Sequence, residues 1–153
     1  MYLKARKYVS GFSFADKKEQ STYAKLLKIS GFAPGEIQKH TPSGYIELTV
    51  AYWRKANQIH TWFVKNAQNG TDDCGDYHVE EEQLVELRDL CQRIIDNPNK
   101  AEALLPTQSG FFFGDTQYGE YYFQDLKETV KQLNSILNNP KFEDWNFYYQ
   151  SSW

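Results

Sequence analysis

Three segments of the chain have the residue pattern of β-strands. Residues 2–9 alternate loosely between two faces, and residues 45–52 combine tyrosine, isoleucine, threonine and valine. Residues 145–153 contain two tryptophans, a phenylalanine and two tyrosines. Because β-branched and aromatic side chains pack well on a pleated surface, we expect a strand in each segment, the one at 45–52 being the clearest.

Four other segments repeat apolar residues every three or four positions, which is the spacing of one helical face. The predicted helices cover residues 21–31, 53–68, 79–95 and 118–137. The second follows the strand at 45–52 without a break. The buried stripe of the last is expected to comprise Tyr121, Phe123, Leu126, Val130, Leu133, Ile136 and Leu137.

The remaining segments are predicted to be connections. Residues 71–78 form a polar, acidic loop, residues 101–105 a short helical piece, and residues 107–114 an apolar loop or short strand. No linker, internal repeat or low-complexity stretch separates the elements. We therefore expect one α+β domain over residues 1–153, with about three main helices packed on a small antiparallel sheet.

Composition indicates a globular, cytoplasmic protein. Of its 153 residues, 41% are apolar and 24% are charged, which excludes a disordered chain. No stretch has the roughly 18 apolar residues of a membrane helix, and the N-terminus lacks the pattern of a secretion signal. Nothing suggests an oxidising compartment, so we expect Cys74 and Cys91 to be free thiols.

Charge is distributed unevenly along the chain. Residues 1–70 contain eleven Lys or Arg and four Asp or Glu, whereas residues 71–153 contain six and sixteen. The halves either face each other within the fold or form two opposite patches. Separate patches would favour self-association, so a homo-oligomer is one expected state.

Polar residues are densest in the predicted helix at 53–68. A strand that leads into a helix with basic and amide groups is a plausible anion or nucleotide site, although the glycine-rich phosphate loops are absent. The competing interpretation is a solvated basic face with an asparagine and a histidine satisfied at the edge of the core. The candidate ligand residues are Arg54, Lys55, Asn57, His60, Trp62, Tyr77 and Gln108.

Neither a metal site nor a catalytic site is predicted. The spacing of Cys74, His78, Cys91 and His60 matches no zinc motif, and the aspartates after residue 71 lack the order of a calcium loop. We therefore expect no metal and no cofactor. Cys74 with a nearby histidine, or His60 itself, is the weakest functional hypothesis, because no catalytic-cysteine signature surrounds Cys74.

The acidic stretch after residue 71 is the candidate surface for a protein partner. A solvated helix face is the usual meaning of such a charge run. Nucleic acid is not expected as a partner, because the sequence pI is near 5.6, although the N-terminal half interleaves lysines with aromatic rings. The candidate partner residues are Asp72, Asp73, Asp76, Glu81, Glu82 and Glu86.

Three segments together carry a resemblance to a known family. They are Tyr52 to His60 (YWRKANQIH), Asp72 to Cys74 (DDC) and Leu105 to Gly114 (LPTQSGFFFG). They resemble a family of small, functionally unassigned proteins of tailed bacteriophages and prophages, over residues 45–138. The family has no established catalytic residues. The resemblance implies a protein made in the cytoplasm of an infected bacterium, where it binds a host or defence protein or sequesters a nucleotide.

Overall fold

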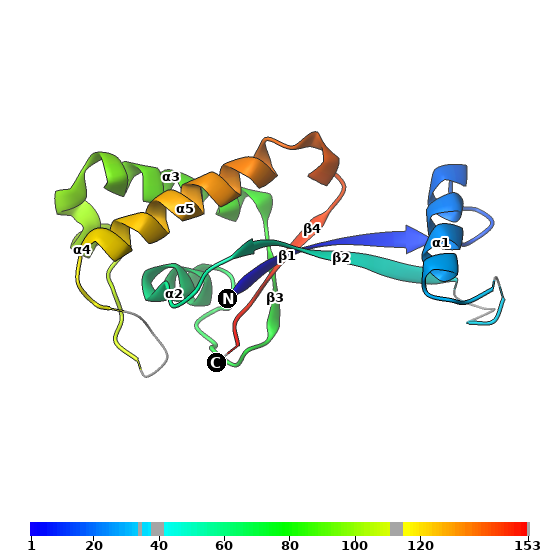
Figure 1. The fold of residues 1–153 in the computed structure, drawn as a ribbon, viewed down its shortest axis with the longest axis horizontal. Helices are drawn as coiled ribbons and strands as arrows, with labels where there is room; N and C mark the ends of the chain where they lie inside the picture. Colours follow the sequence, from blue (N-terminus) through cyan, green and yellow to red (C-terminus); the bar gives the residue numbers. More distant parts are fainter. Residues whose placement is uncertain (34, 38–41, 111–114, 153) are drawn as a thin grey trace. The chain divides into compact units, whose positions relative to one another are not determined.

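The computed structural model describes residues 1–33, 35–37, 42–110 and 115–152. It has an α+β fold, which confirms the predicted fold class. Four strands form an antiparallel sheet in the order β2-β1-β4-β3 (Figure 1). The elements are β1 (Tyr2–Ser10), α1 (Lys17–Ile29), β2 (Ser43–Tyr52), α2 (Asn57–Asn66), β3 (Asp76–Val79), α3 (Glu81–Asp96), η1 (Pro98–Lys100), α4 (Ala101–Leu104), α5 (Glu120–Leu137), η2 (Pro140–Phe142) and β4 (Asn146–Gln150).

The strand β3 lies where the sequence predicts a loop. It pairs antiparallel with β4, with Asp76 opposite Gln150 and Val79 opposite Phe147. β3 has four residues, of which Val79 alone is buried, so its alternation is too short to stand out in the sequence. Its pairing with β4, and not its own composition, makes it a strand.

Two helices begin four residues away from their predicted starts. α1 begins four residues before Ser21, because the Asp16 side chain accepts a hydrogen bond from the Glu19 amide at 2.9 Å and caps the helix. α2 begins at Asn57 and not at Trp53. Lys55 has a φ of 62°, and this left-handed conformation prevents a continuous helix between β2 and α2.

The chain forms two compact units. Unit 1 comprises residues 1–5 and 48–153, and unit 2 comprises residues 6–47. β1 and β2 contribute residues to both units. The expectation of a single domain over residues 1–153 stays a prediction. No helix in the described ranges is both long enough and apolar enough to cross a membrane.

The core of unit 1 combines side chains of β1, α2 and β4 with those of α3 and α5, which run side by side (Figure 1). The buried stripe of α5 follows regular helical spacing, but it includes Tyr122 in place of the predicted Tyr121, which is 75% exposed. Tyr122 is four residues before Leu126 and so shares its face, whereas Tyr121 is turned toward solvent. The fully buried side chains of the two helices are Leu84, Leu87, Cys91, Ile94, Leu126 and Leu133.

Unit 2 has a small core of its own. Val9 of β1 packs with Tyr23 and Leu27 of α1. Gly11 lies directly against the Tyr23 ring, where an added Cβ would be 2.2 Å from Cδ1. Any other residue at this position would displace the ring, so a glycine is required where the chain leaves β1.

We expect Leu126→Ala to lower the free energy of unfolding by about 2–5 kcal/mol, because the truncation leaves a cavity between α3 and α5. Urea denaturation measures the change. Leu48→Ala is the control, since Leu48 is 47% exposed and its truncation removes little buried surface. Equal destabilisation by the two substitutions would contradict the described core.

Candidate functional site

α2 is the centre of the polar cluster that the sequence singles out, and six of its ten residues are buried. Asn57, Gln58, His60 and Trp62 are each at most 6% exposed. Arg54 and Lys55 are exposed and precede the helix, so the prediction that the helix over 53–68 includes them is wrong. The charged candidates Arg54 and Lys55 therefore lie in solvent, whereas the amide candidate Asn57 is buried.

The Asn57 side chain holds the segment after α4. Its Nδ2 donates to the Asp115 carbonyl at 3.2 Å, and its Oδ1 accepts from the Gln108 amide at 2.8 Å. Thr61 Oγ1 donates to Gln108 Oε1 at 2.7 Å. The structure thus brings together two predicted ligand residues, Asn57 and Gln108. Their contact positions the backbone of the segment after α4.

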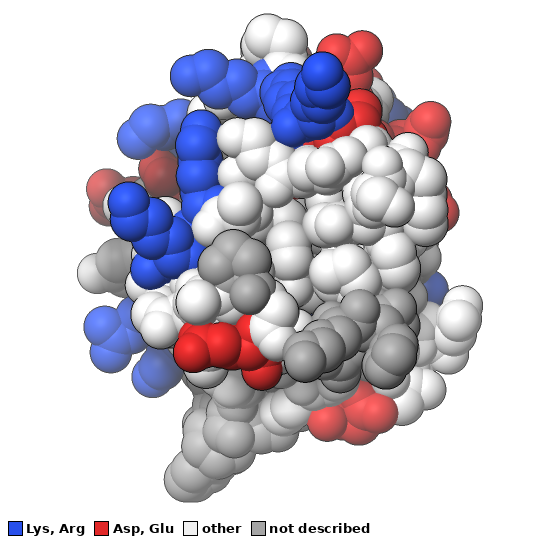
Figure 2. Space-filling view, turned by 90° about the vertical axis from the view of Figure 1, so that its right-hand side faces the viewer, with Lys and Arg blue, Asp and Glu red and all other residues white. Residues whose placement is uncertain are grey.

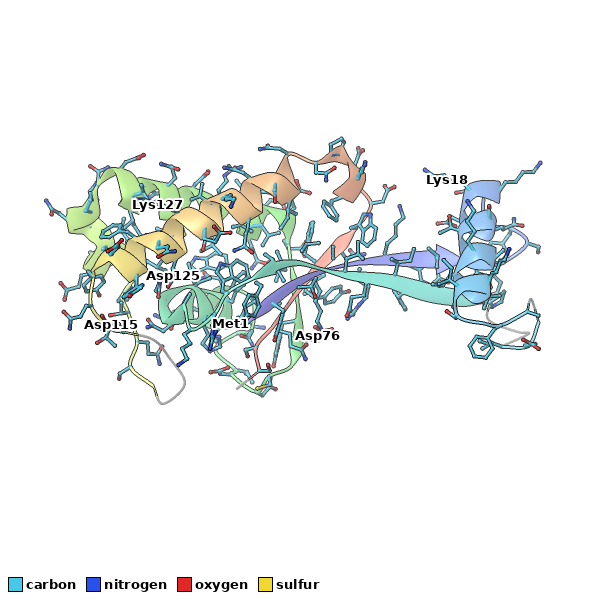
Figure 3. All side chains as sticks on the ribbon, viewed as in Figure 1. Met1, Lys18, Asp76, Asp115, Asp125 and Lys127 are labelled. Carbon is cyan, nitrogen blue, oxygen red and sulfur yellow. The ribbon has the colours of Figure 1, made fainter. Side chains whose placement is uncertain are left out.

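Gln58 connects α2 to α5. Its Nε2 donates to Asp125 Oδ2 at 3.1 Å, and the labelled Asp125 side chain lies on α5 in Figure 3. Burial raises the pKa of Asp125, and the hydrogen bond from Gln58 offsets part of this rise. Trp53 makes a second connection to α5, because its Nε1 donates to Thr129 Oγ1 at 2.8 Å.

His60 lies between Tyr149 of β4 and Asp72. Its Nδ1 is 2.7 Å from the Tyr149 hydroxyl, and its Nε2 is 3.0 Å from Asp72 Oδ2. A carboxylate only accepts, so a neutral His60 donates through Nε2–H and accepts from Tyr149 O–H through Nδ1. Burial, followed by the Asp72 charge, raises the pKa of Tyr149. The Tyr149 ring also stacks on Phe63 at 4.1 Å.

Trp62 lines a small hollow between α2, α3 and α4. Its ring meets Phe63 edge-on at 5.3 Å. The hollow has a volume of about 220 Å³. Its walls are formed by Gln58, Thr61, Trp62, Lys65, Asn66, Leu90, Leu104, Leu105 and Pro106.

Tyr77 and Asp73 form a local contact at the start of β3. The Tyr77 hydroxyl donates to Asp73 Oδ1 at 3.0 Å, and this hydrogen bond is the main cause of a raised pKa of Tyr77. The Gly75 amide donates to the same oxygen at 2.9 Å. Asp73 thus orders the turn before β3.

The other candidate partner residues fall into two groups. Asp72 and Asp76 are paired within the chain, Asp72 with His60 and Asp76 with Lys4 at 3.2 Å. Figure 3 shows the labelled Asp76 on β3. The second group lies in the first two turns of α3, where each side chain is exposed: Glu81, Glu82 and Glu86.

In the described residues, the two thiols and the other metal-binding residue types do not gather at one place. Cys74 is half-buried with a φ of 59°, while burial raises the pKa of the free Cys91 thiol to about 12. Such a thiol remains protonated and unreactive near neutral pH. Among residues 1–33, 35–37, 42–110 and 115–152, no three His, Cys, Asp or Glu side chains come together as metal ligands.

Sequence reasoning missed Tyr149, Asp125 and Thr129, the residues that satisfy the polar groups around α2. Tyr149 was expected only as part of the C-terminal strand, and nothing in its neighbours marks a partner 89 positions away. Gln68 and Ser151 are also buried, and their side-chain polar atoms have no hydrogen-bond partner within the described ranges.

We expect Tyr149→Phe to destabilise unit 1 by about 1–3 kcal/mol, because it leaves His60 Nδ1 buried without its donor. Chemical denaturation measures the loss. Tyr121→Phe is the matched control, since that ring is 75% exposed. If the two variants unfold at the same denaturant concentration, the hydrogen bond contributes nothing to stability.

We expect Asp125→Asn to change the pH dependence of stability. A raised folded pKa favours protonated Asp125 in the folded state, so the contribution of Asp125 to wild-type stability falls as pH rises above the ordinary value of 3.8. The neutral variant lacks this loss. Urea unfolding near pH 3 and pH 7 should therefore show that the free energy of unfolding of the variant, relative to that of the wild type, increases with pH. Asp115→Asn, at an exposed site, is the control; a difference that shrinks with rising pH would contradict the assignment.

No protein-family model, curated protein or solved structure matches the chain. What the protein does is therefore inferred from its own sequence, contacts and charges.

Proposed function

We propose that this chain is a bacteriophage accessory or counter-defence protein that acts by binding a host or defence protein in the bacterial cytoplasm. It is proposed to act without catalysis. Its resemblance to small proteins of tailed phages supports the cellular context. The acidic outer face of α3 supports binding as the mode of action.

The acidic outer face of α3 is defined here by Glu82, Glu86 and Asp89. These residues are four and three positions apart, so they lie along one side of the helix, and all are exposed. Asp89 pairs with the neighbouring Arg88 at 2.8 Å. In the described part of the chain, no ion pair engages Glu82 or Glu86. The face therefore presents unneutralised carboxylates to solvent.

These carboxylates contribute little to the fold. Glu82 lies in the first turn of α3, where the helix dipole favours a negative charge. Glu86 follows it by four residues, a spacing at which two like charges repel each other and weaken the helix. An acidic surface of this kind accelerates and orients the approach of a basic partner. Because this repulsion weakens the helix, the presence of the two glutamates is better explained by partner recognition than by stability.

Sequestration of a small ligand is the second candidate, and the hollow beside Trp62 favours it. Lys65 on its wall is a cation that can bind an anion, whereas the Thr61 hydroxyl already donates to Gln108. Its volume of about 220 Å³ is below the roughly 300–1,000 Å³ of most ligand pockets. Asn57 and His60 are also buried in contacts with the rest of the chain. We therefore rank protein binding first.

We expect Glu82→Lys combined with Glu86→Lys to abolish partner capture, because it replaces attraction by repulsion at the centre of the acidic outer face. The tagged protein and this variant are incubated with bacterial lysate, and the captured proteins are quantified by mass spectrometry. A specific partner should decrease at least tenfold.

The control is Glu102→Lys combined with Glu128→Lys, which changes the net charge equally at exposed sites outside α3. It should capture as much partner as the wild type, and circular dichroism should show that both variants are folded. Identical protein sets captured by all three forms would refute the proposed surface.

A further inference from the structure

Unit 2 is basic, although the whole chain is acidic. Residues 6–47 contain seven Lys or Arg and four Asp or Glu, whereas the residues of unit 1 contain ten and sixteen. The sequence pI near 5.6 thus averages two compact units of opposite charge. An argument from pI against an anionic partner therefore does not apply to unit 2.

The positive charge of unit 2 is concentrated on one face of α1. At 100° per residue, four lysines lie on the side opposite the buried Tyr23 and Leu27. All four are exposed, and no ion pair involves them within the described ranges. We call this surface the basic face of α1: Lys17, Lys18, Lys25 and Lys28. Lys and Arg side chains gather along one side of the view in Figure 2, and Figure 3 labels Lys18 on α1.

The acidic residues of unit 2 do not neutralise this face. Asp16 caps α1. Glu47 accepts from Arg6 Nε at 2.9 Å, and Glu36 accepts from the Ala33 amide at 2.6 Å. Glu19 lies in the first turn of α1, at an angle between its buried and its basic side. The lysines are therefore available to an anionic partner.

Exposed aromatic rings occur near both ends of the basic face. Phe14, just before α1, is 83% exposed and stacks on Phe12 with ring centroids 4.9 Å apart and an interplanar angle of 17°. Phe32, after the helix, is 46% exposed. Two parallel rings with one largely open to solvent offer a ready surface for stacking by a further planar group.

We infer that unit 2 binds single-stranded nucleic acid through the basic face of α1 together with Phe14. The lysine ammonium groups would neutralise phosphates, and the Phe14 ring would stack on a base. This combination of point charges and open rings is what sequence-tolerant binding of single strands requires. It is independent of the acidic outer face of α3, which belongs to unit 1.

Other anionic partners fit the same residues less well. A helix that lies on a membrane inserts its apolar face, but the apolar side of α1 is already buried in unit 2 through Tyr23 and Leu27. An acidic protein would need a lysine-rich contact, and lysine is depleted in protein interfaces. The 84% exposed Ile29 adds one apolar side chain to the lysines, which is too little to anchor a membrane helix.

The test measures binding of fluorescein-labelled oligo-dT and oligo-U, each about 20 nucleotides long, to the full chain by fluorescence anisotropy. Four phosphate contacts predict a slope of log K against log salt of roughly −2.8. Lys18→Glu combined with Lys25→Glu should reduce the affinity at least tenfold near 50 mM salt and roughly halve the slope. Phe14→Ala should reduce the affinity about fivefold or more and leave the slope unchanged.

The control is Lys127→Glu combined with Lys131→Glu, an equal change of charge at exposed lysines of α5; Figure 3 labels Lys127. It should bind within twofold of the wild type. Equal loss in the control, or no binding of either oligonucleotide near 50 mM salt, would overturn the inference. Binding to phosphatidylglycerol vesicles without binding to the oligonucleotides would overturn it in favour of a lipid surface.

Discussion

α2 carries asparagine, glutamine and histidine side chains into the interior of unit 1, and each buried polar group needs a hydrogen-bond partner there. Asn57 finds its partners in the segment after α4, and Gln58 in α5. His60 finds them in β4 and Asp72. These bonds, together with the stacking of Tyr149 on Phe63, define where the surrounding elements lie relative to α2. The polar cluster thus specifies the arrangement of unit 1.

This constraint changes the meaning of the residues that look functional in the sequence. A histidine within 3.0 Å of a carboxylate and a tyrosine resembles a catalytic arrangement in its composition. Here the imidazole is 2% exposed, and both its nitrogens are engaged with side chains of the protein. A buried imidazole that is paired on both sides in this way orders the interior of unit 1. The surfaces that we propose for recognition are the charged outer sides of α3 and α1.

The two charged surfaces belong to different compact units. The acidic outer face of α3 lies on a helix whose opposite side packs against α5. The basic face of α1 lies on a helix whose opposite side packs on Val9 of β1. In each case the core determines which side of an amphipathic helix is buried, and the charges on the other side face solvent. One chain therefore carries exposed charged faces of opposite sign.

Much of the fold can be predicted from the chain, but the candidate site can be predicted only in part. The strands β1 and β4 and the helix α3 lie close to their predicted positions, because each has a clear alternating or helical pattern. β3, with four residues, is too short for its alternation to stand out, and the polar first turn of α1 lacks an apolar stripe. The prominence of Asn57 and His60 is visible in the sequence, whereas their partners Asp115 and Tyr149 are far away along the chain.

The sequence by itself determined the α+β class, the amphipathic faces of the helices and the uneven distribution of charge, because these depend on residue type and on spacing within one segment. The tertiary structure decided the break at Lys55 between β2 and α2, the pairing of β3 with β4 and the burial of His60. It also assigned the basic and the acidic residues to two compact units. These features depend on contacts between distant segments, and no local pattern encodes which distant groups will meet.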